Sequence, residues 1–159
     1  MLRAVDDWTE RMPKVIRACE ESERPAVLGL IADCGLPAAG LADHWHTTWV
    51  ALDPADSSRV IGSVALEIHG SAALLRSLAT HKDHRGQGLG DALYRFAIAR
   101  AGELGATSVS LLTTTAEPFF AAREFHTVSR DALPAALKAS AEFQGACPAS
   151  ATAMLRSLV

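Results

Sequence analysis

The chain has 159 residues, a length that predicts one domain with a sizeable buried core. Of these residues 49% are hydrophobic and 21% are charged, which is the composition of an ordinary globular protein and excludes a disordered chain. The net charge of −3 combines both signs, so the composition gives no indication of a nucleic-acid-binding surface.

The sequence predicts an N-terminal extension at residues 1–13 and one domain at residues 14–159. The extension spaces Leu2, Val5 and Met12 as one apolar stripe. Because it carries several acids and no long apolar run, we expect neither a signal peptide nor a membrane anchor, and therefore a cytoplasmic protein with no membrane partner.

The cysteines and histidines indicate no metal site. Cys19, Cys34 and Cys147 are far apart in the sequence and form no C-x-x-C pair. This spacing favours small buried thiols in a reducing compartment over a disulfide framework. The histidines show no H-E-x-x-H arrangement, so we expect no bound metal.

The first half of the chain predicts a strand, a helix and a pair of antiparallel strands. These elements cover residues 14–20, 22–34, 46–52 and 59–67. Pro25 suits the first turn of the helix, and Gly35 ends it. Val27, Leu28 and Ile31 are expected to face inward from that helix.

The second half begins with a buried strand and an amphipathic helix. Leu74, Leu75 and Leu78 form the apolar run of the strand, and the helix at 89–104 ends before Gly105. The remaining elements are predicted as a strand at 107–114, a short helix at 117–122, an extended segment at 125–128, a helix at 131–144 and a last strand at 150–158.

A glycine-rich loop, Arg85-Gly86-Gln87-Gly88-Leu89-Gly90, separates the buried strand from the amphipathic helix. Glycines leave backbone N–H groups uncovered where the chain enters the helix, and the helix dipole adds positive character there. The loop therefore predicts a seat for a phosphate or pyrophosphate. It lacks the Gly-Lys-Ser/Thr of a Walker loop, and Asp91 stands where a dinucleotide fingerprint needs its third glycine.

Several ordered blocks resemble one enzyme family. Arg85-x-x-Gly88-x-Gly90, directly after a strand, resembles the acetyl-CoA pyrophosphate loop of the GNAT superfamily of N-acetyltransferases. Four further blocks resemble the GNAT branch found among arsenic-resistance genes. They are LLRSL at 74–78, LLTTTA at 111–116 followed by Phe119-Phe120, Glu142-Phe143, and Cys147-Pro148-x-Ser150-Ala151. The resemblance covers about residues 15 to 158.

This resemblance implies an α/β (α+β) fold, in which helices flank a mixed, mostly antiparallel central sheet of six to seven strands. It implies direct transfer of acetyl from acetyl-CoA to the primary amine of a small molecule, without a covalent enzyme intermediate. Many relatives pair, so a homodimer is expected. Residues 35–46 are expected to line the acceptor side, although a plain surface connection is the alternative.

The resemblance also assigns the cofactor-binding residues. Backbone groups of Leu78, Ala79 and Thr80, at the end of the buried strand, are expected to hold the pantetheine arm and the thioester oxygen. The pyrophosphate is expected on the loop residues Arg85, Gly86, Gln87, Gly88, Leu89 and Gly90.

For the general base the sequence offers two residues near one strand end. Glu67 is the first choice, because GNAT enzymes often direct a carboxylate at the bound amine from this position. His69 projects to the same face two residues later and is the rival. Each could instead be a polar residue at a hairpin end.

Arg76 lies within an otherwise apolar strand, where a guanidinium needs an anionic partner. One interpretation is a fork for the acidic group of an amino acid or toxic amino-acid analogue. The other is a structural ion pair with Glu67 or Glu117. Ser77 is expected to assist in substrate binding, although alternation places it on the opposite strand face.

The acid that protonates the leaving thiolate departs from the common GNAT pattern. Many members carry a tyrosine where this chain has Phe120, and phenylalanine cannot donate a proton. Water, a hydroxyl of Thr113, Thr114 or Thr115, or no specific acid at all is expected to serve instead. Thr114 is also assigned to substrate binding. Phe120 favours one rival function, a catalytically weak acyl-CoA sensor. A second rival is acetylation of protein termini or lysines.

Overall fold

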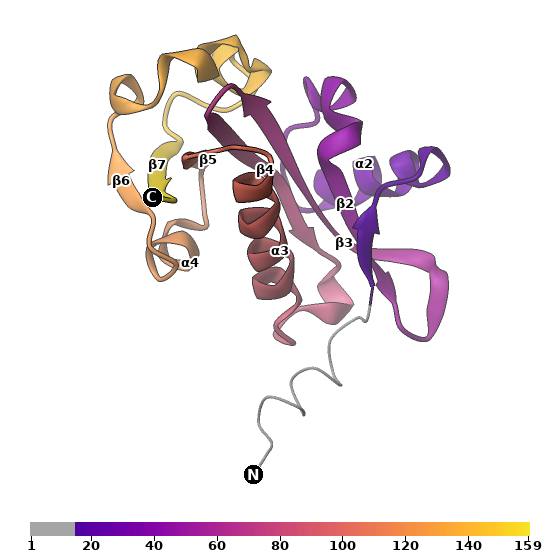
Figure 1. Ribbon diagram of the computed structural model, residues 1–159. Coiled ribbons are helices and arrows are strands. Elements are labelled where there is room, and N and C mark those ends of the chain that lie inside the picture. Colours follow the sequence, from indigo (N-terminus) through magenta and orange to yellow (C-terminus); the bar gives the residue numbers. More distant parts are fainter. Residues whose placement is uncertain (1–14) are drawn as a thin grey trace.

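The computed structural model describes residues 15–159, so the predicted extension at 1–13 lies outside the described residues. A seven-stranded sheet forms the centre of the molecule (Figure 1). Its strands are β1 (Ile16–Ala18), β2 (Thr48–Asp53), β3 (Asp56–His69), β4 (Ala72–Thr80), β5 (Ser108–Thr113), β6 (His126–Val128) and β7 (Thr152–Ser157). The order is β1-β2-β3-β4-β5-β7-β6, and within residues 15–159 only the β4–β5 pair is parallel. The predicted mixed, mostly antiparallel sheet is confirmed.

Helix α3 (Leu89–Glu103) packs on one face of the sheet, in front of β4 in Figure 1. Alternation along β4 sends Ala73 and Leu75 to this face, where Leu93 and Ala97 of the helix join the main apolar cluster. Gly88 begins the helix at φ +82°, a conformation that L side chains rarely adopt.

The other face is covered by helix α2 (Arg24–Asp33) and by the segment between β6 and β7. The predicted inward residues Val27 and Ile31 are buried in α2, but Leu28 is 39% exposed. Leu30 takes its place against the sheet, because it lies on the same helix face as Val27 and Ile31.

The prediction of one helix at residues 131–144 is wrong. Three short 3-10 turns replace it, at Arg130–Ala132, Ala135–Ala139 and Ala141–Gln144. Pro134 and Ser140 interrupt the segment with extended backbone, at ψ 133° and 142°. The helical spacing of Leu133 and Leu137 is nevertheless real, since both side chains pack on Leu74 in a separate apolar cluster. The short helix α4 (Glu117–Ala121) follows β5 as predicted.

Two irregularities of β4 position the site. Only Ala72–Leu74 pair with β5, at Ser108–Ser110, so the two strands separate beyond this point. On its other edge β4 pairs with β3 through a shift of register between Ser63 and Ala65. Ser77 lies in this bulge at φ +58°, which breaks the strict alternation expected from the sequence.

Candidate active site

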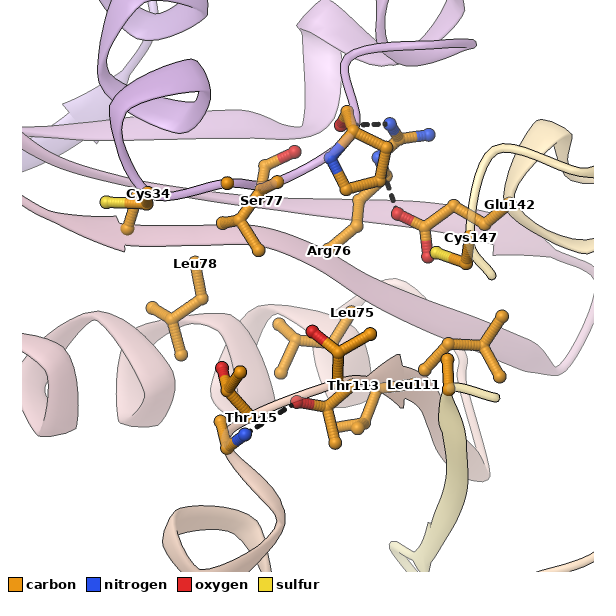
Figure 2. A pocket seen from close by; sticks show the side chains of 18 of the residues that line it. Cys34, Leu75, Arg76, Ser77, Leu78, Leu111, Thr113, Thr115, Glu142 and Cys147 are labelled. Atoms are coloured by element: carbon orange, nitrogen blue, oxygen red, sulfur yellow. Dashed lines mark hydrogen bonds and ion pairs between the residues drawn. The ribbon is translucent and has the colours of Figure 1, made fainter. Parts of the chain in front are cut away.

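A cavity of about 800 Å³ lies where β4 and β5 separate. Leu75–Thr80 of β4 form one wall, and Leu111–Ala116, at the end of β5, form the opposite wall. Further lining residues come from the loop after α2, at Cys34–Pro37, and from the segment before β7, at Cys147. Figure 2 shows the two walls facing each other, with Ser77 and Leu78 across from Thr113 and Thr115. The separation of the two strands therefore leaves a partly open cavity that can hold a ligand.

The glycine-rich loop lies at one end of the cavity. Arg85 and Gly90 belong to the lining, and the Arg85 side chain donates from Nε to the Thr80 carbonyl over 3.3 Å. Gly86 and Gly88 both have positive φ, 78° and 82°, and the loop is exposed up to the start of α3. The first-turn N–H groups of α3 lack intrahelical acceptors, and the helix dipole adds positive character at the same place. Both would attract an anion. This geometry suits a pyrophosphate.

The free edge of β4 continues from the loop into the cavity. Beyond Leu74 this edge has no β5 partner, while the opposite edge remains paired with β3 at Ala79 and Thr80. Leu78, Ala79 and Thr80 all line the cavity. An extended ligand arm can therefore hydrogen-bond along the strand as an additional strand would.

Arg76 is enclosed in a charge cluster. Its side chain is fully buried and donates to Glu67 over 2.7 Å and to the carbonyls of Pro37 and Ala39 over 3.2 and 2.8 Å. Its Nε also lies 3.5 Å from Glu142. The structural interpretation, an ion pair with Glu67, therefore describes the observed geometry, whereas Glu117 is bound by Thr127 instead.

Glu67 is enclosed in the same cluster. Its carboxylate is 1% exposed and accepts hydrogen bonds from Arg76 and Ser140, and it contacts His69 at 2.9 Å. Burial alone would raise the pKa of Glu67, but the hydrogen bonds of these three partners outweigh it and leave the pKa below its ordinary value. Glu67 is not among the cavity-lining residues. These surroundings do not favour Glu67 as the general base.

Hydroxyl-bearing residues line both walls of the cavity. Ser77 is 6% exposed, and within residues 15–159 its Oγ has no hydrogen-bond partner. The bulge turns it toward the cavity that Arg76 also lines, contrary to the expectation from alternation. Thr114 and Thr115 line the opposite wall, whereas Thr113 Oγ accepts from the backbone N–H of Ala116.

Glu142 was not selected as a site residue from the sequence, yet it lines the cavity with 3% exposure. It comes from the Ala141–Gln144 turn, and its carboxylate lies beside Arg76 and Cys147 (Figure 2). Burial is the main cause that raises the pKa of Glu142 to about 7. Burial and the charge of Glu142 together raise the pKa of Cys147 to about 11.

A family model for the acetyltransferase (GNAT) domain matches residues 44–127, more than half of the chain. The chain belongs to the GNAT family. It is an acetyl-CoA-dependent N-acetyltransferase, and the loop and free strand edge described above fit acetyl-CoA as its cosubstrate. A search of curated proteins finds no match.

Solved GNAT structures share the fold. Rv2747 from Mycobacterium tuberculosis, in complex with CoA, is 22% identical with a TM-score of 0.75, and the match covers 91% of this chain and 99% of that chain. N-acetylglutamate synthase from Neisseria gonorrhoeae, complexed with coenzyme A and N-acetyl-glutamate, is 21% identical with a TM-score of 0.77, over 91% of this chain. The matched region is only 35% of that synthase chain. A GNAT-family acetyltransferase from Staphylococcus aureus is 15% identical with a TM-score of 0.72, over 91% of this chain and 99% of that chain.

In this GNAT enzyme no tyrosine hydroxyl reaches the cavity. Phe120 is 7% exposed and packs edge-to-face on Phe119 and Phe125. The single tyrosine, Tyr94, donates to the Arg123 carbonyl and accepts from Arg156, and it is not a lining residue. Protonation of the thiolate by water or by a threonine hydroxyl remains a prediction.

Two further sequence predictions concern metals and membranes. Within residues 15–159, no three His, Cys, Asp or Glu side chains are grouped to hold a metal ion. In the same part of the chain, none of the helices has the length and apolar character needed to cross a bilayer.

Proposed function

We propose that the enzyme transfers acetyl to the primary amine of a small molecule bound at the Glu142 end of the cavity. The observation that carries this proposal is the continuity of the cavity, whose lining runs from Arg85 and Gly90 at the loop to Glu142 and Cys147. A pantetheine arm along β4 would bring its thioester between these two ends. The acceptor end belongs to a partly open, concave cavity lined by side chains, which favours a small molecule over a folded protein.

In this proposal the enzyme recognises the amine of the acceptor, and the acceptor does not need an acidic group. The acidic-group version of the proposal depends on Arg76, and Arg76 is already bound by Glu67 and two carbonyls. The cavity instead presents the carboxylate of Glu142, which attracts an ammonium group. Amino acids are the first acceptors to test, since the structural neighbour from Neisseria gonorrhoeae is an N-acetylglutamate synthase.

The proposal is tested by measuring release of the CoA thiol from acetyl-CoA with a panel of acceptors. The panel contains acidic amino acids and their phosphinate analogues, neutral amino acids, simple alkylamines and a short peptide. We expect turnover with small primary amines, whether or not they carry an acidic group. Turnover of the peptide alone would instead support a protein acetyltransferase, and CoA binding without release on any amine would support a sensor.

Substitution of Gly88 tests the cofactor loop. Gly88→Leu places a side chain at φ +82° where the pyrophosphate is expected, so CoA affinity in calorimetry should fall at least about 10-fold. Gly105→Leu is the matched control, because Gly105 also has positive φ, 92°, but lies at the far end of α3. Both variants should lose about 1–2 kcal/mol of stability. Equal CoA affinity in the two variants would refute the loop assignment.

Two finer assignments also belong to the proposal. The LLTTTA block at 111–116 and the Cys147–Ala151 block support a place in the GNAT branch of arsenic-resistance genes. The resemblance supports a homodimer, which sedimentation velocity would test. A cytoplasmic location stays a prediction.

A further inference from the structure

We propose that Glu142, from the Ala141–Gln144 turn, is the general base that removes a proton from the acceptor ammonium. This inference rests on the proposed acetylation of a primary amine. It differs from the assignment made from the sequence, which places the base at Glu67 or His69 on β3.

The position of Glu142 favours this role. Glu142 lines the cavity, and Glu67 does not. Glu142 also lies at the end of the lining away from the glycine loop, where Figure 2 shows its carboxylate beside Arg76 and Cys147. Among the described residues, Glu142 is the one carboxylate in the cavity lining, so an amine that approaches the thioester from this end meets this acid. A general base must lie within hydrogen-bond reach of the proton that it removes.

The Glu142 carboxylate is held loosely. Its Oε2 lies 3.5 Å from Arg76 Nε, longer than an ordinary N–H···O hydrogen bond. Within the described residues, that Nε has no hydrogen-bond partner. The other two guanidinium nitrogens of Arg76 already serve Glu67 and two carbonyl groups. The carboxylate therefore keeps acceptor capacity for a substrate N–H.

The proton affinity of Glu142 also suits a general base. The charged and titratable groups that face Glu142 are Arg76 from β4, Glu67 from β3 and Cys147 from the loop before β7. Burial and the negative charge of Glu67 raise the pKa of Glu142, while Arg76 and the hydrogen bond with Cys147 oppose them. The resulting value of about 7 is close to the operating pH, where a general base is most effective.

Acetyl transfer begins with removal of a proton from the acceptor. The ammonium N–H bond breaks and its proton moves to a Glu142 oxygen, which leaves a neutral amine. The amine lone pair then forms the N–C bond to the thioester carbonyl, and the C–S bond breaks as the tetrahedral adduct collapses. The second amine proton ends on the departing thiolate, and Glu142 returns its proton to solvent. The net products are the N-acetyl amide, the CoA thiol and one proton.

Cys147 does not replace Glu142 as the reacting group. With its pKa raised to about 11, the thiol stays protonated near neutral pH. A protonated thiol is a poor nucleophile, so an acetylated Cys147 is not expected as an intermediate. This agrees with direct transfer of acetyl from the cosubstrate to the amine.

The test compares Glu142→Gln with wild type on an alkylamine or amino acid that is turned over. Glutamine keeps the shape and removes the base, so kcat should fall about 100- to 1,000-fold. The wild-type rise of kcat through a pH of about 7 should also disappear. Glu142→Asp should keep that rise at a lower kcat. Glu103→Gln, which removes an exposed acid in α3, is the control and should match wild type.

A weakly basic acceptor separates base catalysis from a structural effect. An arylamine or alkoxyamine with a conjugate-acid pKa of about 5 arrives neutral and needs no proton removal before attack. With this acceptor the Glu142→Gln defect should shrink to less than about 3-fold. An equal loss of kcat on both acceptors would overturn the proposal. A Glu142→Gln variant that keeps the wild-type kcat and the rise of kcat near pH 7 would also overturn it.

Failure of this inference can be told apart from failure of the proposed function. If wild type binds CoA but turns over no amine, the proposed function fails. If wild type is active and Glu142→Gln is equally active with the same pH profile, only the role of Glu142 fails. Calorimetry with CoA should show affinities within about 2-fold for both proteins, because Glu142 lies away from the pyrophosphate loop.

Discussion

Glu67 on β3 and Glu142 on the Ala141–Gln144 turn are both buried, and both pair with Arg76. Glu67 receives hydrogen bonds from Arg76 and Ser140 and contacts His69 and His44 at 2.9 and 3.5 Å. Glu142 has only the longer contact to Arg76 and the neighbouring thiol of Cys147. The first acid is held in its charged form, and the second readily takes up a proton.

This difference shows that burial alone does not decide what a carboxylate does. Burial disfavours the charge of both groups, yet the pKa of Glu67 is lowered and that of Glu142 is raised. The number of donors aimed at each carboxylate decides the direction. Two acids whose surroundings separate their pKa values are suited to different roles, here a structural anchor and a base.

Removing the shared arginine should have the largest effect on stability. Arg76→Met leaves Glu67 buried without its cation, so the free energy of unfolding should fall by about 3–5 kcal/mol in urea denaturation. Arg100→Met, which breaks an exposed pair with Glu103, is the control and should cost less than about 1 kcal/mol. A stable Arg76→Met protein with only a raised acceptor KM would show instead that Arg76 binds substrate.

Glu142→Gln should change how the free energy of unfolding depends on pH. Because the folded-state pKa of Glu142 is raised, its contribution to stability is lost as pH rises from about 4.5 to about 7. Glutamine mimics the neutral acid and avoids this loss. The variant should therefore gain on the order of 2 kcal/mol relative to wild type at pH 8, and less than about 1 kcal/mol at pH 5. An unchanged difference across this range would contradict the raised pKa.

His69→Ala should have the smallest effect on stability of these three substitutions, and it changes the surroundings of Glu67. It removes one contact of the Glu67 carboxylate, which should cost about 1 kcal/mol at neutral pH. The pKa of Glu67 is lowered, so its stabilisation is present above the unfolded value and is lost in acid. The cost should shrink toward pH 3 in thermal denaturation. His126→Ala, at an exposed position of β6, should show no such trend.

The sequence was sufficient for the features that depend on local patterns. Gly86 and Gly88 mark the loop because their positive φ values require glycine, and the apolar spacing of α3 follows the helical period. The strands of the sheet appear close to their predicted residues. These signals lie within a few residues of each other, so no knowledge of the fold is needed to read them.

The contacts between distant residues could not be predicted in this way. The sequence left Glu67 and Glu117 as alternative partners of Arg76, and only the antiparallel register of β3 and β4 selects Glu67. Alternation did not predict that Ser77 would line the same cavity as Arg76, because a bulge has no clear local signature. Glu142 follows Arg76 by 66 positions, on a turn that was expected to be helical, and the Glu142-Phe143 block alone does not place the carboxylate in a cavity.

The short pairing of β4 with β5 should make the thermal stability of the enzyme depend on its cosubstrate. The seam at Ala72–Leu74 is the only direct strand contact between the β1–β4 and β5–β7 parts of the sheet described at residues 15–159. An acetyl-CoA arm in the gap would brace the two parts against each other. Since a ligand that binds only the folded form raises its stability with concentration, the melting temperature should track the supply of acetyl donor. Enzyme that lacks its donor would then be the first to unfold on heating.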